Sequence, residues 1–294
     1  ARAVAERAAL EAADGGPAAA IARIEASDLD LSDPAHAAAL RTLLEQLARA
    51  GLHQRALARI DASLAAHPET AEFHTLRGEV LERAGRSEAA QKAFERAVAL
   101  GPSGAPALAG LARLAAARGA DEAADAWYAR AVDADPESAS IAYAAASFLR
   151  ESGRPEAAEQ RLEILLYRHP SHAAGAEELA RLLLARGGEL DRALDYAQRA
   201  VMFGQGPSGL ETRGRIRLAR GEVAEALEDL VAAAAASPRS PGAHYRLGLA
   251  RVAAGDAEGA REALRTALGL GEFPEAAQAR AELARLQEIA NPAP

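Results

Sequence analysis

Residues 71–104 read AEFHTLRGEVLERAGRSEAAQKAFERAVALGPSG, and this stretch decides the fold. Apolar residues recur at helical spacing before Gly85 and again after it, which predicts two amphipathic helices joined by a short turn. A glycine suits the end of the first helix because it readily adopts the left-handed conformation. The second helix should end before Pro102, since the residue ahead of a proline disfavours the α conformation. The stretch therefore predicts a helical hairpin.

The same hairpin pattern recurs along the whole chain. Glycines that follow a run rich in Ala, Leu and Arg are 36 residues apart once and 34 apart six times. Small residues also recur at one position of the first helices, where they would let the paired helix approach closely. The glycines are Gly15, Gly51, Gly85, Gly119, Gly153, Gly187, Gly221 and Gly255, and the small residues are Gly78, Ala112, Ala146, Ala180, Gly214 and Gly248. One hairpin buries too little apolar surface alone, so neighbouring hairpins must stack.

A hairpin of 34 residues with this pattern resembles the tetratricopeptide repeat. With position 1 at Ala71, the family's positions 8, 20, 24, 27 and 32 fall on Gly78, Ala90, Phe94, Ala97 and Pro102. The resemblance implies an all-α, right-handed α-solenoid of about eight such units plus a C-terminal capping helix. It implies a single solenoid over residues 1–290, with a capping helix at 274–290 and a tail at 291–294. The units would start near residues 1, 37, 71, 105, 139, 173, 207 and 241.

Composition excludes several classes of protein. The chain has no Cys, which rules out disulfides and thiolate zinc sites. Its net charge of −8 disfavours nucleic-acid binding, which needs a basic face for phosphates. No apolar run approaches the roughly 20 residues that span a bilayer. The chain starts at Ala1 without a visible signal peptide, so we expect it to be a fragment of a longer protein.

Motifs that carry chemistry are absent from the sequence. The single lysine, Lys92, lies within a predicted second helix, so there is no phosphate-binding loop, and neither HExxH nor GxSxG occurs. His169 and His172 flank an inter-repeat turn without further ligands nearby. Asp28, Asp30 and neighbouring residues resemble the start of a calcium loop, but later positions of that motif do not match. We therefore expect no catalytic residue, cofactor or metal, and a protein that is not an enzyme.

The resemblance also implies where a partner would bind. Positions 2, 5, 9, 12 and 13 of the first helices would face a concave groove that binds a protein or peptide. The residues at these positions include Arg41, Glu45, Glu72, Glu79, Arg113, Tyr143, Ser147, Arg150, Glu177, Arg181, Glu211, Arg215 and Tyr245. Four of the arginines come from successive units, and such a ladder would suit carboxylates and peptide carbonyls. Inter-repeat ion pairs remain an alternative explanation for them.

Three functions remain open at this point. The favoured one is a non-enzymatic scaffold for protein–protein interaction, part of a bacterial assembly or secretion complex. The chain could instead be a spacer or self-association module in exopolysaccharide export, or an accessory region of an enzyme. Residues 248–276 weakly resemble bacterial tetratricopeptide-repeat lipoproteins of exopolysaccharide and exosortase systems, which favours a lipoprotein-anchored periplasmic location over the cytoplasm. The Lys/Asn clamp of chaperone-binding family members is absent, since Lys92 and Asn291 are misplaced for it. The sequence leaves the oligomeric state open.

Overall fold

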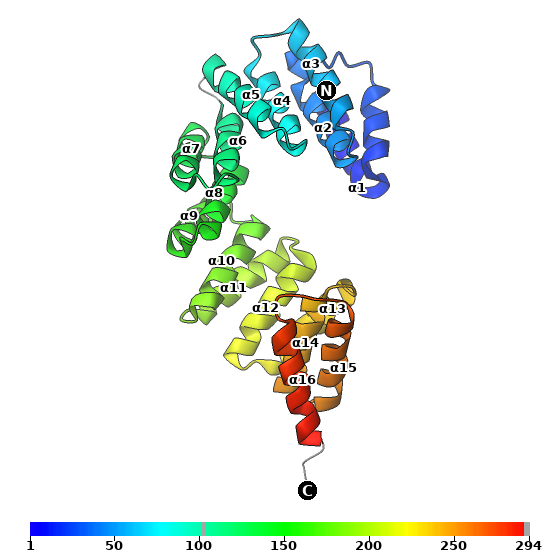
Figure 1. Cartoon of the computed structure of the whole chain (residues 1–294), viewed down its shortest axis with the longest axis vertical. Coiled ribbons are helices and arrows are strands. Elements are labelled where there is room, and N and C mark those ends of the chain that lie inside the picture. Colours follow the sequence, from blue (N-terminus) through cyan, green and yellow to red (C-terminus); the bar gives the residue numbers. More distant parts are fainter. Residues whose placement is uncertain (102–103, 291–294) are drawn as a thin grey trace. The chain divides into compact units, whose positions relative to one another are not determined.

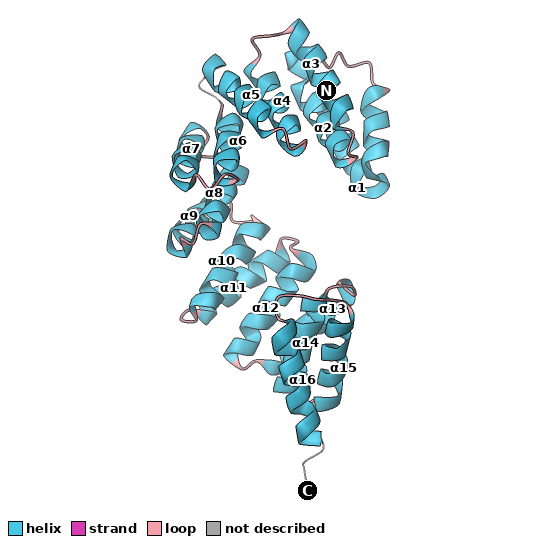
Figure 2. Ribbon diagram, in the orientation of Figure 1, coloured by secondary structure: helices cyan, strands magenta, loops and turns pink. Residues whose placement is uncertain are grey.

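The computed structural model describes residues 1–101 and 104–290 of the chain. Pro102 and the predicted tail 291–294 lie outside these residues. All regular secondary structure in the described part is helical (Figure 2), as the repeat pattern predicted. The helices are α1 (Arg2–Glu25), η1 (Pro34–His36), α2 (Ala37–Arg49), α3 (His53–Ala66), α4 (Ala71–Arg83), α5 (Ser87–Leu100), α6 (Ala105–Ala116), α7 (Asp121–Ala134), α8 (Ala139–Glu151), α9 (Pro155–Arg168), α10 (Ala173–Arg186), α11 (Leu190–Met202), α12 (Gly206–Arg220), α13 (Val223–Ala236), α14 (Pro241–Ala253), α15 (Ala257–Gly269) and α16 (Ala276–Ala290).

Glycines shape the turns inside the hairpins, as the sequence predicted. Gly85 has φ 71°, and the next amide, of Arg86, donates to the carbonyl of Leu81 at 2.9 Å. This 6→1 bond caps the end of α4 and satisfies a carbonyl that has no partner within the helix. The prediction was wrong for the first hairpin, because Gly16 rather than Gly15 takes the positive φ of 75°. Two adjacent glycines can both adopt this conformation, and α1 bends at the second one.

Glycines of several first helices pack closely against side chains of second helices. A Cβ atom on Gly78 of α4 would lie 2.5 Å from the ring of Phe94, and a Cβ on Gly110 of α6 would lie equally close. The Phe94 ring is completely buried between these two glycines. Gly214 and Gly248 meet Leu230 and Leu264 in the same way. Close approach of the paired helices, predicted from the small-residue series, is therefore confirmed at Gly78, Gly214 and Gly248.

The chain divides into two compact units, residues 1–154 and 155–294. In the first unit α4 packs on α5 and α6 on α7, and the first helices α2, α4, α6 and α8 contact one another in succession (Figure 1). In the second unit α10 pairs with α11, α12 with α13, and α14 with α15. There α10, α12 and α14 again contact one another in succession, and α16 packs on α15.

Arginines connect neighbouring hairpins in both units. Arg96 donates to Glu69 at 2.8 Å across 27 residues, and Arg154 donates to Asp125 at 2.8 Å across 29 residues. In the second unit Arg186 donates to Glu159 at 2.9 Å across 27 residues. Each of these arginines therefore reaches back by slightly less than one repeat.

His172 makes the start of α10 sensitive to pH. Its Nδ1 accepts a hydrogen bond from the amide of Gly175 at 3.0 Å, which caps the helix. Burial lowers the pKa of His172 below 6.5, and nearby His169 lowers it further. The folded state thus binds fewer protons than the unfolded one, so this stabilisation is complete above pH 6.5 and is lost as the pH falls from there through the folded-state pKa.

We expect the His172→Ser variant to retain a cap but lose this pH dependence. Between about pH 7.5 and about pH 5, the wild type should lose about 1 kcal/mol more unfolding free energy than the variant, which is the usual contribution of an N-cap. Urea unfolding at several pH values measures this difference. Parallel profiles for the two proteins would show that the cap does not titrate.

Candidate binding surface on the first helices

Each unit has a candidate site on its first helices. We call it the first-helix surface, which is formed by α2, α4, α6 and α8 in the first unit and by α10, α12 and α14 in the second. Successive first helices contact one another within each unit, so their outward side chains form a continuous layer. The residues predicted from the sequence lie on these helices.

In the first unit, Arg41 of α2 already has partners in the neighbouring hairpin. Its Nη1 donates to both carboxylate oxygens of Glu79, at 3.1 and 3.0 Å. Its Nη2 lies 3.6 Å from a carboxylate oxygen of Glu72, whose side chain is about half exposed. Glu45, one turn after Arg41, is half-buried. The charges of Glu72 and Glu79 are therefore partly neutralised by Arg41.

Arg113 of α6 is held in the same way. Its Nε and Nη2 donate to the two carboxylate oxygens of Glu82 at 2.9 and 2.6 Å, which forms a bidentate pair between α6 and α4. Burial alone would lower the pKa of Arg113, but the bonds to Glu82 and its charge raise it overall. This guanidinium is therefore already occupied, which favours the ion-pair explanation for this member of the predicted ladder.

A cavity of about 500 Å³ opens beside Arg113, between α6, α7 and α8. Tyr128 and Phe148 pack against each other in its wall with ring centroids 5.4 Å apart. Burial raises the pKa of the Tyr128 phenol. Ser147 and Glu151 of α8 also line the cavity. The cavity thus combines an aromatic wall with hydroxyl and carboxylate groups, a mixture that suits a side chain from a bound peptide.

Tyr143 and Arg150 also lie on α8. Tyr143 is half-buried, whereas Arg150 is exposed. Arg150 donates to the neighbouring Glu151 at 2.8 Å. This exposed pair contributes little to stability, so Arg150 can exchange partners at small cost.

In the second unit, two of the predicted residues are buried. Glu177 of α10 has only 5% of its surface exposed and accepts hydrogen bonds from Ser208 and Thr212 of α12. Tyr245 of α14 has 6% exposed and packs against Phe273 at 5.8 Å between ring centroids. Both residues join helices together and leave little surface for a partner.

The other three predicted residues of the second unit are accessible. Arg181 of α10 has 53% of its side chain exposed and lies 3.8 Å from Glu178. Glu211 of α12 lies 3.7 Å from Nε of Arg246 on α14. Arg215 is half-buried on α12, one repeat after Arg181.

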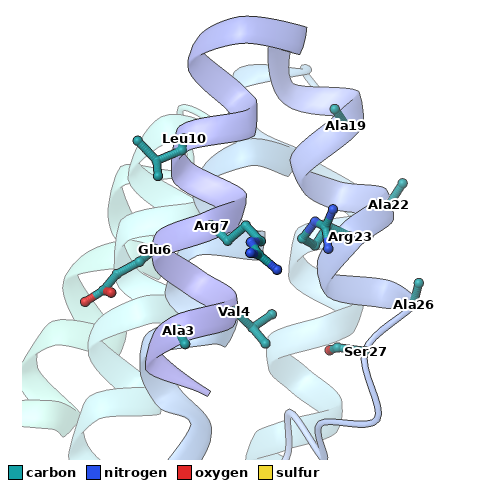
Figure 3. A pocket seen from close by; sticks show the side chains of 10 residues that line it. All are labelled: Ala3, Val4, Glu6, Arg7, Leu10, Ala19, Ala22, Arg23, Ala26 and Ser27. Carbon is teal, nitrogen blue, oxygen red and sulfur yellow. The ribbon is translucent and has the colours of Figure 1, made fainter.

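A second cavity, of about 900 Å³, lies at the N-terminal hairpin and involves none of the predicted residues. It opens between the two arms of α1, where Val4 and Arg7 of one arm face Arg23 of the other (Figure 3). The bend at Gly16 brings these arms together. The adjacent glycines were the sequence signal for this bend, but nothing in the repeat pattern predicted an open space between the arms.

Other kinds of site find no support in the described residues. No three His, Cys, Asp or Glu side chains gather there as a metal site would require. In the segment that resembles the start of a calcium loop, Asp30 accepts hydrogen bonds from the amide and hydroxyl of Ser32. Asp33 caps η1 by accepting a hydrogen bond from the amide of Ala35. Over the same residues, no helix has the length and apolarity to cross a membrane.

A model of the family described as tetratricopeptide repeat matches residues 46–105, 78–139, 143–209, 212–273 and 245–291. These ranges cover most of the chain and agree with the helical hairpins described above. The chain belongs to the tetratricopeptide repeat family. Tetratricopeptide repeats are typical of protein–protein interaction scaffolds. No curated protein matches the chain in sequence. The weaker resemblance of residues 248–276 to exosortase-associated lipoproteins stays a prediction.

Solved structures of other tetratricopeptide-repeat proteins share the fold. A chain of the APC/C hetero-tetramer Cut9-Hcn1 aligns with a TM-score of 0.68 and 15% identity, over 92% of this chain and 52% of that one. Yeast Tom70 aligns with a TM-score of 0.59 and 15% identity, over 94% and 60%. PilF of Pseudomonas aeruginosa aligns with a TM-score of 0.59 and 18% identity, over 69% and 93%. The chain thus spans about half the length of the Cut9-Hcn1 chain, and the likeness concerns the fold alone.

Within the tetratricopeptide repeats, sequence reasoning missed the role of Tyr128. Tyr128 lies 34 residues after Phe94, at the same repeat position, which indicates a core residue. Tyr128 is indeed only 5% exposed, yet it also lines the cavity beside Arg113. The neighbouring Trp127 packs with the hydrophobic core under Arg130, whose guanidinium lies 4.5 Å from the ring centroid. The available signal was a large aromatic residue among small ones, since Ala116, Ala117 and Ala144 line the same cavity as Tyr128.

Proposed function

We propose that this tetratricopeptide-repeat chain is a non-catalytic scaffold that binds a segment of another protein on its first-helix surface. The observation that carries the proposal is the cavity of about 500 Å³ beside Arg113, because its lining includes Arg113 and Ser147 from two successive first helices. A preformed cavity between packed helices lets a guest side chain bind without much ordering of the scaffold. We further propose that the partner belongs to a bacterial assembly or secretion complex. The arginine-rich, lysine-poor composition supports a bacterial source for the chain.

Site-specific photocrosslinking tests the location of binding. A photoreactive residue at Ser147 should capture a partner in cells of the source organism, whereas the same residue at Ala99 should not. Ala99 is the matched control because it is exposed on a second helix, α5, of the same unit. Capture of the same protein from both positions would contradict binding at the first-helix surface.

A substitution that fills the cavity then tests its contribution. Ser147→Arg should weaken binding of the purified partner by about tenfold or more, because contacts at a recessed site dominate an interface. Ala99→Arg, which adds the same charge on α5, should change the dissociation constant by less than about twofold. Isothermal titration calorimetry measures both constants, and circular dichroism checks that the variants are folded. Equal affinity of Ser147→Arg and wild type would remove the cavity from the binding site.

A further inference from the structure

Arg215 of α12 has the surroundings of a carboxylate-binding residue without a carboxylate of its own. Its side chain is half-buried, and it makes no hydrogen bond or ion pair in the part of the chain that the structure describes. A guanidinium offers five N–H donors and no acceptor, so partial burial without an acceptor is unfavourable. An acceptor from outside the chain would satisfy it.

Neighbouring positive charges make the unpaired guanidinium of Arg215 still less favourable. Burial lowers the pKa of Arg215, and the charge of Arg246 on α14 lowers it further, as does that of Arg181 on α10. Glu211 and Glu275 act in the opposite direction, but both of these carboxylates pair with Arg246. Among Arg181, Arg215 and Arg246, Arg215 is therefore the arginine whose charge is least compensated by the described residues.

The first unit shows what such an arginine binds when an acceptor is present. Arg113 occupies the same repeat position as Arg215, and its bidentate partner Glu82 lies 31 residues earlier on the preceding first helix. The residue 31 positions before Arg215 is Leu184 on α10, whose side chain has no acceptor atom. The carboxylate that completes the pair at Arg113 is thus missing from the equivalent place at Arg215.

Nearby acidic residues do not replace it. Glu177 is buried and accepts from Ser208 and Thr212 of α12. Glu178 lies 3.8 Å from Arg181. The carboxylates around Arg215 are therefore engaged by other groups.

We infer that Arg215 binds an acidic side chain of a protein segment on the first-helix surface of the second unit, in the place equivalent to that of Glu82 at Arg113. Arg181, exposed at the same position of the preceding repeat, offers a second contact for a neighbouring acidic residue. The inference rests on the proposed function, since it specifies the chemistry of the partner on the first-helix surface. The net charge of −8 repels acidic chains at a distance, so affinity for one must come from a local site.

Fluorescence anisotropy with synthetic peptides tests this on the full chain. The probe is a labelled, C-terminally amidated peptide of four Gly-Ser-Glu repeats, and its controls replace Glu by Gln or by Lys. A third control, the Gln peptide with a free C-terminus, separates side-chain carboxylates from a terminal one. The Glu peptide should bind at physiological salt more tightly than all three controls. Failure of the Glu peptide to bind the wild type, or equal binding of the Gln peptides, would overturn the inference.

Two variants connect that binding to Arg215. Arg215→Met should weaken binding of the Glu peptide by about tenfold or more, because a bidentate charged pair is lost. Leu184→Glu should weaken it similarly by placing a carboxylate where Glu82 stands at Arg113. The matched controls are Arg239→Met, which removes an exposed charge from a turn of the same unit, and Leu184→Gln, which adds no charge. Both should stay within about twofold of the wild type.

The outcomes separate this inference from the proposed function. Should either Arg215→Met or Leu184→Glu be folded by circular dichroism and bind the Glu peptide like the wild type, Arg215 is not the acceptor site. A partner captured at Ser147 whose affinity is unchanged by Arg215→Met would leave the scaffold function standing and remove the acidic specificity. Equal capture of a partner at Ala99 and at Ser147 would contradict binding at the first-helix surface, on which both this inference and the proposed function depend.

Discussion

Phe94→Ala is expected to lower the free energy of unfolding by about 3–5 kcal/mol. The ring is fully buried between Gly78 of α4 and Gly110 of α6, where an added Cβ on either glycine would lie 2.5 Å from ring atoms. Removing the ring leaves a cavity between two hairpins, and the glycines carry no side chains to fill it. Urea unfolding followed by circular dichroism measures the loss.

Two comparisons test the cause of this loss. Phe203→Ala removes the same side chain where it is 42% exposed, so we expect a much smaller effect, within about 1 kcal/mol. Gly78→Ala gains about 1 kcal/mol of helix propensity but overpacks the ring at a cost of about 1–3 kcal/mol, so it should destabilise. Adding Phe94→Leu to Gly78→Ala should recover part of that cost. If Phe94→Ala and Phe203→Ala have equal effects, the packing between the glycines is not what stabilises the hairpins.

Asp229→Leu is expected to cost about 3 kcal/mol, at the lower end of the range for breaking a buried ion pair. The Asp229 side chain on α13 is 4% exposed and accepts from Arg213 at 2.9 and 2.6 Å and from Arg217 at 2.8 Å. Its loss leaves Arg213 and Arg217 of α12, whose side chains are 20% and 18% exposed, without their carboxylate partner. Because both arginines can turn partly towards water, we expect a cost at the lower end of that range. Thermal and urea unfolding measure the effect.

The control for Asp229 is another acidic residue of the same unit. Asp191 pairs with Arg220 but is 92% exposed, so Asp191→Ala should change stability by less than about 1 kcal/mol. Replacing Arg213 and Arg217 by Met in the Asp229→Leu background should restore much of the stability, because no buried charge is then left unpaired. An additive loss in that triple variant would show that the three residues act independently.

Periodicity was sufficient to predict the fold but not the state of each site residue. The 34-residue spacing predicted the hairpins, and the small-residue series predicted the close packing seen at Gly78 and Phe94. Whether an arginine is free depends instead on one residue of the preceding helix. Arg113 and Arg215 share a repeat position, yet Glu82 pairs with the first whereas Leu184 precedes the second. Such a pair depends on a contact between two helices, and the residue pattern of one helix does not predict that contact.

The burial of individual polar residues could not be predicted from the sequence either. Glu177 has the spacing of a surface residue, but the hydroxyls of Ser208 and Thr212 in the next hairpin let it be buried. Likewise, either of two adjacent glycines could have formed the first turn, and only the structure shows that Gly16 does. Gly15 and Gly16 have the same local conformational freedom, so local preference could not decide between them.

Arginine links that reach back by nearly one repeat also bear on how such a chain can evolve. The repeat that starts near residue 139 carries Arg154, the basic half of the link to Asp125, and Glu159, the acidic half of the next link to Arg186. Duplication or loss of a gene segment that encodes one whole hairpin brings together equivalent halves and strands no charge. Segments of any other length would mismatch them. The array can therefore grow or shrink in whole-repeat steps, which lets selection adjust the number of contacts with a partner without first redesigning the joints.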